Sequence, residues 1–129
     1  MNAVEQLARR VLVADDDPDI LSLVAFRLER SGFEVLRASD GEEALRLAIS
    51  EAPDLALLDV SMPKLDGYEV TQQMRANEKT SGIPIILLTA RAQETDMAAG
   101  LAAGADDYIK KPFSPQELGA RVETLLGRP

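Results

Sequence analysis

The sequence predicts an α/β fold in which a doubly wound parallel sheet lies between two layers of helices. Short apolar runs alternate along the chain with segments of helical period, which is the pattern of βαβ units. Three of the runs are apolar throughout, as expected of parallel strands that are covered on both faces. Because the chain has 129 residues, of which 46% are hydrophobic, we expect one domain over residues 1–129 with a core from about 10 to 127.

Five strands are expected from the apolar runs. They span residues 11–14, 33–36, 55–58 and 83–88, with a weaker run at 108–109. The first, third and fourth runs are continuously apolar, whereas Phe33-Glu34-Val35 alternates in the manner of a strand at the edge of a sheet. The central strands should therefore be buried and the second strand more exposed.

The first two helices are predicted by their capping residues. The first should begin at the cap Asp17, with Pro18 at the first helical position, and should stop at Gly32. Its core face carries Leu21, Val24 and Leu28. The second helix should begin at Asp40, where Glu43 has the spacing of a capping box, and should end before Pro53.

The remaining helices are expected near residues 66–77, 94–103 and 114–126. The fourth helix is rich in alanine and interrupted by Gly100, so we expect it to be the least stable of the five. The fifth is the best marked, because Ser114-Pro115-Gln116-Glu117 is a capping box with proline at the first helical position. Its apolar face consists of Leu118, Val122, Leu125 and Leu126.

The composition excludes several classes of chemistry. The chain has no cysteine and no histidine, which excludes a disulfide framework, a thiolate or imidazole metal site and a Cys nucleophile. The formal net charge of -8 at pH 7 argues against direct binding to nucleic acid or to anionic lipid, which needs clustered Lys and Arg. No secretory-signal core begins the sequence, and the longest apolar run, residues 85–88, is too short to span a bilayer. We therefore expect a soluble, cytoplasmic protein without a membrane partner.

Polar residues that could carry chemistry follow four of the predicted strands. In a doubly wound sheet the ligand crevice lies beyond the carboxyl ends of the strands. The residues at those ends are Asp15-Asp16-Asp17 after the first strand, Asp59 after the third, Thr89-Ala90 after the fourth and Lys110-Lys111-Pro112 after the fifth. We therefore expect these groups to meet at one edge of the sheet.

The acidic residues of this edge predict a metal site. Asp15, Asp16 and Asp59 would repel one another there, and a bound cation would offset that repulsion. Since only oxygen ligands are available, Mg²⁺, or Mn²⁺ in its place, is favoured over zinc. An Mg²⁺ ion would keep several water ligands, whose positions can accept phosphate oxygens.

The same edge has the groups that phosphoryl transfer to a carboxylate requires. Asp59 would be the nucleophile, and the Lys111 ammonium would neutralise charge on the transferring oxygens. The Thr89 hydroxyl and the Ala90 N–H can hydrogen-bond the phosphoryl oxygens. Because the chain has no histidine, the phosphodonor must be another molecule.

Five motifs occur in order along the chain. They are Val11-Leu12-Val13-Ala14-Asp15-Asp16-Asp17, Asp59-Val60-Ser61-Met62-Pro63-Lys64-Leu65-Asp66-Gly67, Leu87-Leu88-Thr89-Ala90, Gly104-Ala105-Asp106-Asp107-Tyr108 and Lys111-Pro112-Phe113. Any one of them alone is weak, but in this order and spacing they make the chain resemble the receiver domain of bacterial two-component response regulators over essentially its whole length. The resemblance implies a flavodoxin-like (βα)5 fold with strand order 2-1-3-4-5. It also implies that a sensor histidine kinase or a phosphotransfer protein supplies the phosphoryl group.

The resemblance assigns a role to each site residue. Asp59 is implied to be the phosphoacceptor, Asp16 to bind Mg²⁺ directly and Asp15 to bind it through water, while Ser61 contributes its backbone carbonyl. Lys111 matches the lysine of the family because it precedes Pro-Phe, and the bond to the following proline is expected to be cis. Such a domain is not an enzyme in the usual sense, although it assists its own phosphorylation and autodephosphorylation.

The resemblance also implies a conformational switch. In the family, Thr89 is coupled to the rotamer of Tyr108, so that a phosphoryl group on Asp59 draws the Thr89 hydroxyl inward and the Tyr108 ring follows. The surface of the fourth helix, fifth strand and fifth helix changes as a result. This surface would control a downstream protein or an effector domain.

The same surface pairs two subunits in response regulators with winged-helix effectors. Asp107, Glu117 and Arg121 fit the charged pattern of those dimers. The fourth helix, however, has Met97-Ala98-Ala99 and Ala103 where charged partners are expected, so a homodimer through this surface should be weak. Only three residues follow the fifth helix, and we expect no effector domain within the chain.

An aspartyl phosphatase of the haloacid-dehalogenase kind is a rival interpretation. Asp15 and Asp17 would then be the nucleophile and the acid, Thr89 would hold phosphate and Asp106-Asp107 would hold the metal. That family needs its lysine before the last acidic pair, but Lys110-Lys111 come after it. The rival also leaves the acid after the third strand without a role.

Two binding modules are further alternatives. A receiver-like domain that is never phosphorylated would act by protein contact alone, and the intact set of acids argues against it. A nucleotide-binding module would need a glycine-rich loop after the first strand, where three aspartates stand instead. Asp17, which precedes Pro18, is better interpreted as a helix cap than as a metal ligand.

Overall fold

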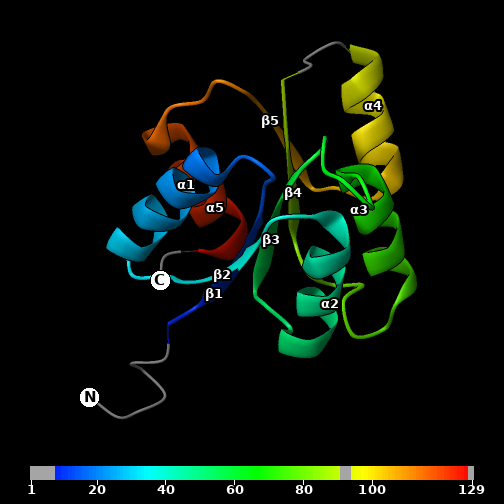
Figure 1. Cartoon of the computed structure of the whole chain (residues 1–129), viewed down its shortest axis with the longest axis horizontal. Coiled ribbons are helices and arrows are strands. Elements are labelled where there is room, and N and C mark those ends of the chain that lie inside the picture. Colours follow the sequence, from blue (N-terminus) through cyan, green and yellow to red (C-terminus); the bar gives the residue numbers. More distant parts are fainter. Residues whose placement is uncertain (1–7, 91–93, 128–129) are drawn as a thin grey trace.

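The computed structural model confirms the α/β fold, with five parallel strands in the order β2-β1-β3-β4-β5 (Figure 1). It describes residues 8–90 and 94–127, and for residues 94–97 it describes the backbone alone. The strands are β1 Arg10–Ala14, β2 Glu34–Ala38, β3 Leu55–Asp59, β4 Ile85–Thr89 and β5 Asp107–Lys110. The helices are α1 Pro18–Arg30, α2 Gly41–Glu51, α3 Gly67–Ala76, α4 Glu94–Ala103 and α5 Pro115–Leu126.

The strands differ from the prediction only at their ends. β2 begins one residue later than predicted because the Phe33 N–H donates to the Leu28 carbonyl at 3.1 Å, which leaves Phe33 in the turn after α1. β4 begins after Pro84, which has no N–H to give to the sheet. β2 and β5 form the two edges of the sheet, and the Glu34 and Arg37 side chains of β2 are exposed.

Each face of the sheet is buried by its own layer of helices. Side chains alternate between the faces along every strand, so that Val11 and Val13 of β1 point to one layer and Leu12 points to the other. α1 and α5 cover the first face, while α2 and α3 cover the opposite one with α4 beside them (Figure 1). The strands β1, β3 and β4 are therefore buried on both sides, as their apolar sequences predict.

Side-chain caps fix where the helices start. Asp17 caps α1, since its Oδ1 accepts the N–H of Asp19 at 2.9 Å, which confirms its interpretation as a cap. Asp40 caps α2 through the Glu43 N–H, but the Glu43 carboxylate accepts from Ser39 rather than from Asp40, so the predicted capping box is displaced by one residue. Within the described parts of the chain, no helix has the length and hydrophobicity needed to cross a membrane.

α4 runs from Glu94 to Ala103 without a break, so the predicted interruption at Gly100 is wrong. Gly100 is buried, and a Cβ built there would lie 3.0 Å from Leu87 Cδ1 and 3.1 Å from the ring of Tyr108. The missing side chain lets α4 approach these side chains of β4 and β5. Tertiary packing therefore outweighs the low helix propensity of glycine at this position.

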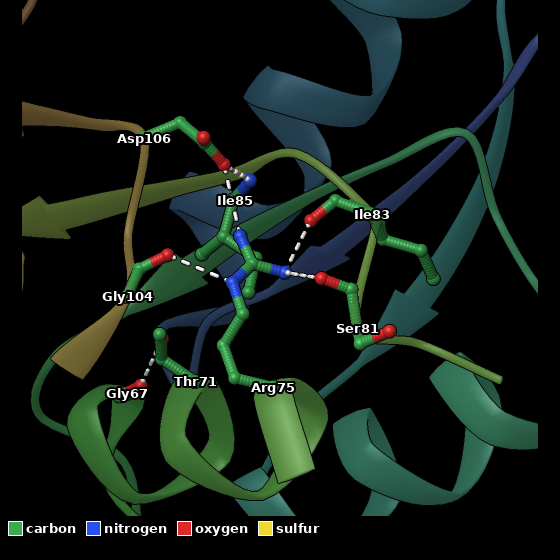
Figure 2. Close-up of polar contacts among 8 residues, drawn as sticks. All are labelled: Gly67, Thr71, Arg75, Ser81, Ile83, Ile85, Gly104 and Asp106. Carbon is green, nitrogen blue, oxygen red and sulfur yellow. Dashed lines mark hydrogen bonds and ion pairs between the residues drawn. The ribbon is translucent and has the colours of Figure 1, made fainter. Parts of the chain in front are cut away.

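At the amino end of the sheet, Arg75 near the end of α3 joins several separate segments (Figure 2). Its guanidinium donates to three backbone carbonyls, those of Gly104 (2.9 Å), Ser81 (3.1 Å) and Ile83 (2.7 Å). It also pairs with Asp106 at 2.9 Å, and the same Asp106 oxygen accepts the N–H of Ile85 at 2.8 Å. One side chain thus connects α3, the loop before β4, the start of β4 and the turn before β5.

Candidate functional site

The carboxyl ends of the strands bring two aspartates and a lysine together, as the sequence predicts. Asp15 directly follows β1 and Asp59 is the last residue of β3, and these side chains are buried, with residue exposures of 0% and 4%. Lys111 follows β5, and its Nζ lies 2.8 Å from Asp15 Oδ2 and 3.4 Å from Asp59 Oδ1. The Asp17 N–H donates to the other Asp15 oxygen at 3.0 Å, which fixes that carboxylate.

Asp16 completes an acidic cluster at the mouth of this site. Carboxylate oxygens of Asp15, Asp16 and Asp59 all lie within 4.8 Å of one another. Asp16 is exposed, so the cluster opens to solvent on its side. Three carboxylates around one ammonium leave a local excess of negative charge on oxygen donors alone, which is the environment that a hard divalent cation fits.

Burial and the neighbouring carboxylate hold the charge of Asp59 in an unfavourable setting. Burial and the negative charge of Asp15 raise the pKa of Asp59 to about 6, against the lowering influence of Lys111 and of the Ser61 N–H. Burial by itself lowers the pKa of Lys111, but its hydrogen bond to Asp15 and the charge of Asp59 outweigh this effect and raise it above the ordinary value. Asp59 is therefore mostly ionised at pH 7, and the lysine stays charged.

Ser61 lies in the loop of residues 60–66 that follows β3. Its backbone N–H donates to Asp59 Oδ1 at 3.3 Å, and its side chain is exposed. The backbone of Ser61 therefore adjoins the acidic cluster, where the family resemblance implies a role for its carbonyl.

Thr89 and Ala90 stand beside the lysine. Thr89 ends β4 and is buried, and its carbonyl accepts the Lys111 N–H at 2.6 Å. Ala90 is exposed, and so is Lys110. The bond between Lys111 and Pro112 is cis, as the resemblance implies.

Tyr108 of β5, the other half of the predicted switch, is buried with its ring against Gly100 of α4. The next strand residue toward the site is Ile109, and Leu87 of β4 lies opposite Tyr108 in the sheet. Thr89 and Tyr108 are thus on adjacent strands, and the ring of Tyr108 is in contact range of the helix that the switch is expected to move.

A neighbouring apolar pocket was not predicted from the sequence. It encloses about 320 Å³ and is lined by Ile20, Leu23, Ala90, Lys111, Pro112 and Phe113. Leu23 and Phe26 on the outer side of α1 are exposed by 52% and 59%. The sequence does contain a sign of this exposed apolar surface. Both residues are large and apolar, yet they fall between the core positions Leu21, Val24 and Leu28.

Two of the charged residues of the predicted dimer surface, Asp107 and Arg121, pair with each other within the chain. Arg121 Nη1 lies 2.8 Å from each carboxylate oxygen of Asp107, and that hydrogen bond raises the pKa of Arg121. The side chain of Met97 lies outside the described residues. A weak homodimer through α4, β5 and α5 stays a prediction.

The sheet order and the residues at its carboxyl edge define a class of protein. Acidic residues after β1 and at the end of β3, a threonine at the end of β4 and a lysine before a proline after β5 are the arrangement of a two-component receiver domain. The sequence model of the response regulator receiver domain family matches residues 11–123 of the chain. The chain belongs to the response regulator receiver domain family.

Known proteins agree with this assignment. The alkaline phosphatase synthesis transcriptional regulatory protein PhoP of Bacillus subtilis is 52% identical over 120 residues, which are 93% of this chain and 49% of that protein. The chain thus spans about half the length of the curated relatives it matches. The DNA-binding dual master transcriptional regulator RpaA of Synechocystis is 46% identical, over 92% of this chain and 49% of that protein.

Solved structures agree as well. The chemotaxis protein CheY4 of Vibrio cholerae is 32% identical with a TM-score of 0.89, over 93% of this chain and 100% of that chain. The receiver domain of the sensor histidine kinase PA1611 of Pseudomonas aeruginosa, which has a magnesium ion coordinated in its active-site cleft, is 35% identical with a TM-score of 0.87. That match covers 94% of this chain and 99% of the other.

Proposed function

We propose that this receiver domain accepts a phosphoryl group onto Asp59 from the phosphohistidine of a sensor histidine kinase or of a phosphotransfer protein. The observation that carries the proposal is the position of the Lys111 ammonium, 2.8 Å from Asp15 and 3.4 Å from Asp59, at the edge where all three acids meet. A lysine there neutralises charge on a carboxylate that must receive an anionic group. The domain is not an enzyme acting on a separate substrate, because its own side chain is modified.

The transfer needs little chemistry from the protein beyond positioning and charge. A carboxylate oxygen of Asp59 attacks phosphorus, a new O–P bond forms, and the electron pair of the breaking P–N bond returns to the imidazole of the donor. Asp59 needs no general base, because with a pKa of about 6 it is mostly ionised at pH 7. Lys111, the Thr89 hydroxyl and the Ala90 N–H would stabilise the phosphoryl oxygens. The same groups would assist the later attack of water that removes the phosphoryl group.

Asp15, Asp16, Asp59 and the Ser61 carbonyl would hold Mg²⁺, or Mn²⁺ in its place. Such an ion supplies charge neutralisation and fixes the orientation of phosphoryl oxygens. The oxygen-only cluster fits a hard cation, and the exposed side of Asp16 leaves room for water ligands. A related receiver domain, that of PA1611, coordinates magnesium in its cleft, which supports the proposal.

The apolar surface beside the site fits the approach of a donor protein. The 320 Å³ pocket shares Ala90 and Lys111 with the site, and exposed Leu23 of α1 is part of its lining. A partner that buries this surface would bring its phosphohistidine to the open side of the acidic cluster. Exposed apolar side chains grouped in this way are typical of contact surfaces between proteins.

The output of the switch would be carried by α4, β5 and α5. Thr89 and Tyr108 lie on adjacent strands, and Tyr108 touches α4, so a shift of Thr89 toward a phosphoryl group can reach that surface. The relatives named above are transcriptional regulators about twice as long as this chain. We infer that the domain controls a downstream protein or an effector domain rather than contacting nucleic acid itself.

Intact-mass analysis after incubation with acetyl phosphate tests the proposal. The wild type should gain a single phosphoryl adduct in the presence of Mg²⁺ and none after removal of the metal with EDTA. Asp59→Asn should gain no adduct, whereas Asp17→Asn should behave as the wild type, because asparagine also caps a helix. A wild type that stays unmodified, even with a phosphohistidine donor, would indicate a receiver-like module that acts by protein contact alone.

A further inference from the structure

The loop between β3 and α3 contains a strained turn. Lys64 has a φ of 73°, in the left-handed region that residues other than glycine rarely adopt. The N–H of Leu65 donates to the Pro63 carbonyl at 2.9 Å, two residues back, so Lys64 is the central residue of a γ-turn. A γ-turn with positive φ is rare and costly, and it persists only where surrounding contacts hold it.

The start of α2 supplies those contacts. The Gly41 N–H donates to the same Pro63 carbonyl at 3.2 Å, and the Lys64 ammonium lies 3.5 Å from Asp40 Oδ2. Gly41 also lets the two backbones approach closely, because a Cβ built on it would lie 1.9 Å from the Leu65 carbonyl oxygen and 2.6 Å from its carbon. These neighbours are backbone atoms, so no side-chain rotation could relieve the overlap. The glycine is therefore required for this arrangement of α2 and the loop.

The other end of the loop is part of the acidic site. Ser61 donates its N–H to Asp59 and precedes the strained turn by only a few residues. The loop also closes on itself, since the Gly67 N–H donates to the Val60 carbonyl at 3.0 Å. With both ends tied and one turn in a rare conformation, the backbone at Ser61 has little freedom that is independent of α2.

We propose that Gly41 is a positioning residue for the metal site: the start of α2 holds the β3–α3 loop in the shape that places the Ser61 carbonyl for a divalent cation. The proposal rests on the Mg²⁺ site proposed above. Gly41 touches neither the cation nor the phosphoryl group. It acts through Pro63 and Leu65 on the backbone that carries Ser61. Residues that support metal ligands in this way strongly influence metal affinity.

The first test measures Mg²⁺ affinity by calorimetric titration of the unphosphorylated full chain, without any activity assay. Gly41→Ala should weaken Mg²⁺ binding by about tenfold or more, while its circular dichroism keeps the wild-type helix content. Gly82→Ala is the matched control, because a Cβ at Gly82 meets no atom within 4 Å, and its affinity should equal that of the wild type. Equal affinities of Gly41→Ala and wild type would overturn the proposal.

The second test uses the wild type alone, so it stands even if Gly41→Ala fails to fold. Coupling between two sites is reciprocal, so Mg²⁺ binding must in turn stabilise the contact between Gly41 and Pro63. The Gly41 N–H lies at the first position of α2 and has no partner within the helix, which makes its hydrogen exchange a report on this contact. Saturating Mg²⁺ should slow that exchange more than the exchange of the Ala52 N–H, which bonds Ala48 at the other end of the same helix.

The outcomes separate the two proposals. If the wild type shows no Mg²⁺ binding in the titration, the metal site of the proposed function fails. If the wild type binds Mg²⁺ but exchange at Gly41 and Ala52 responds equally, the metal site stands and the positioning role is wrong.

Discussion

The two ends of the sheet handle charge in opposite ways. At the amino end, Arg75 places its donors on three carbonyls and one carboxylate, and the Asp106 oxygen has a second donor (Figure 2). At the carboxyl end, the carboxylates of buried Asp15, buried Asp59 and exposed Asp16 lie together, and the Lys111 ammonium pairs with the two buried ones. One end satisfies its charged group with protein atoms, and the other keeps a surplus of negative charge.

The amino end of the sheet thus contributes to the stability of the domain, whereas the carboxyl end has the candidate functional site. Arg75 connects backbone segments that are distant in sequence, so its contacts stabilise the fold. The acidic cluster destabilises the fold, because burial and the charge of Asp15 disfavour the ionised form of Asp59 and raise its pKa. The proposed function explains this surplus, because a site that accepts a cation and an anionic group cannot be neutralised beforehand by its own side chains. Substitutions at the two ends should therefore change stability with opposite signs.

The largest effect is expected from Arg75→Met. The substitution leaves the carbonyls of Gly104 and Ile83 and the Asp106 carboxylate without their charged partner, and the free energy of unfolding should fall by about 3 kcal/mol. Urea unfolding monitored by circular dichroism measures this. Arg46→Met is the control, because Arg46 is largely exposed and its ion pair with Glu43 is long at 3.9 Å. The free energy of unfolding should therefore change by no more than about 0.5 kcal/mol. A loss at position 75 no larger than the loss at position 46 would break the comparison.

A gain of about 2 kcal/mol is expected from Asp59→Asn at pH 7 without metal. Asparagine keeps the shape of the side chain but removes the charge that burial and Asp15 disfavour. The same urea titration, carried out in EDTA, measures the gain. A destabilised variant would show that the ion pair with Lys111 outweighs the burial of the carboxylate.

The pH dependence of the wild type sharpens this second prediction. The pKa of Asp59 is about 6 in the folded state against 3.8 as the ordinary value, so protonation favours the folded state. Protonated Asp59 therefore contributes to the stability of the folded state, and this contribution is fully present below about pH 4 and is lost as pH rises through 6. The stability difference between Asp59→Asn and the wild type should therefore be smallest near pH 4 and grow up to pH 7. Denaturant unfolding of both proteins at four pH values checks this, and a difference that is independent of pH would contradict it.

The smallest effect is expected from the metal itself. Mg²⁺ at ten times its dissociation constant should stabilise the wild type by about 1.4 kcal/mol, seen as a rise in Tm. Arg75→Met should show the same increment, because its network lies at the other end of the sheet, whereas Asp59→Asn should show less. A lost response in Arg75→Met would mean that the two ends are coupled.

The strands and most helix starts could be predicted from the sequence, because residues close together in the sequence determine them. Apolar runs fix the strands, and residues such as Asp17 fix helix starts by their own hydrogen bonds. The meeting of Asp15, Asp59 and Lys111 follows from a general property of parallel sheets, whose carboxyl ends share one edge.

What the sequence did not predict depends on contacts between distant segments. Arg75 looks like an ordinary basic residue in the last turn of a helix, and nothing near it in sequence indicates its bonds to Gly104 and Asp106. The role of Gly100 was misjudged for the same reason, since helix propensity says nothing of the Tyr108 ring across from it. The contact of Gly41 with the loop after β3 likewise appears only once α2 is placed against that loop.

The exposed charges of the edge strand β2 have a consequence for behaviour at high concentration. An open sheet ends in strands whose outer backbone groups can pair with another chain, which leads to aggregation. Here Glu34 and Arg37 project from β2, and Arg37 lies 3.6 Å from Glu29 of the adjoining helix. A second sheet that adds to this edge would have to desolvate those charges. The strand whose alternating residues predict an edge position thus also has charges that oppose the joining of separate molecules into a common sheet.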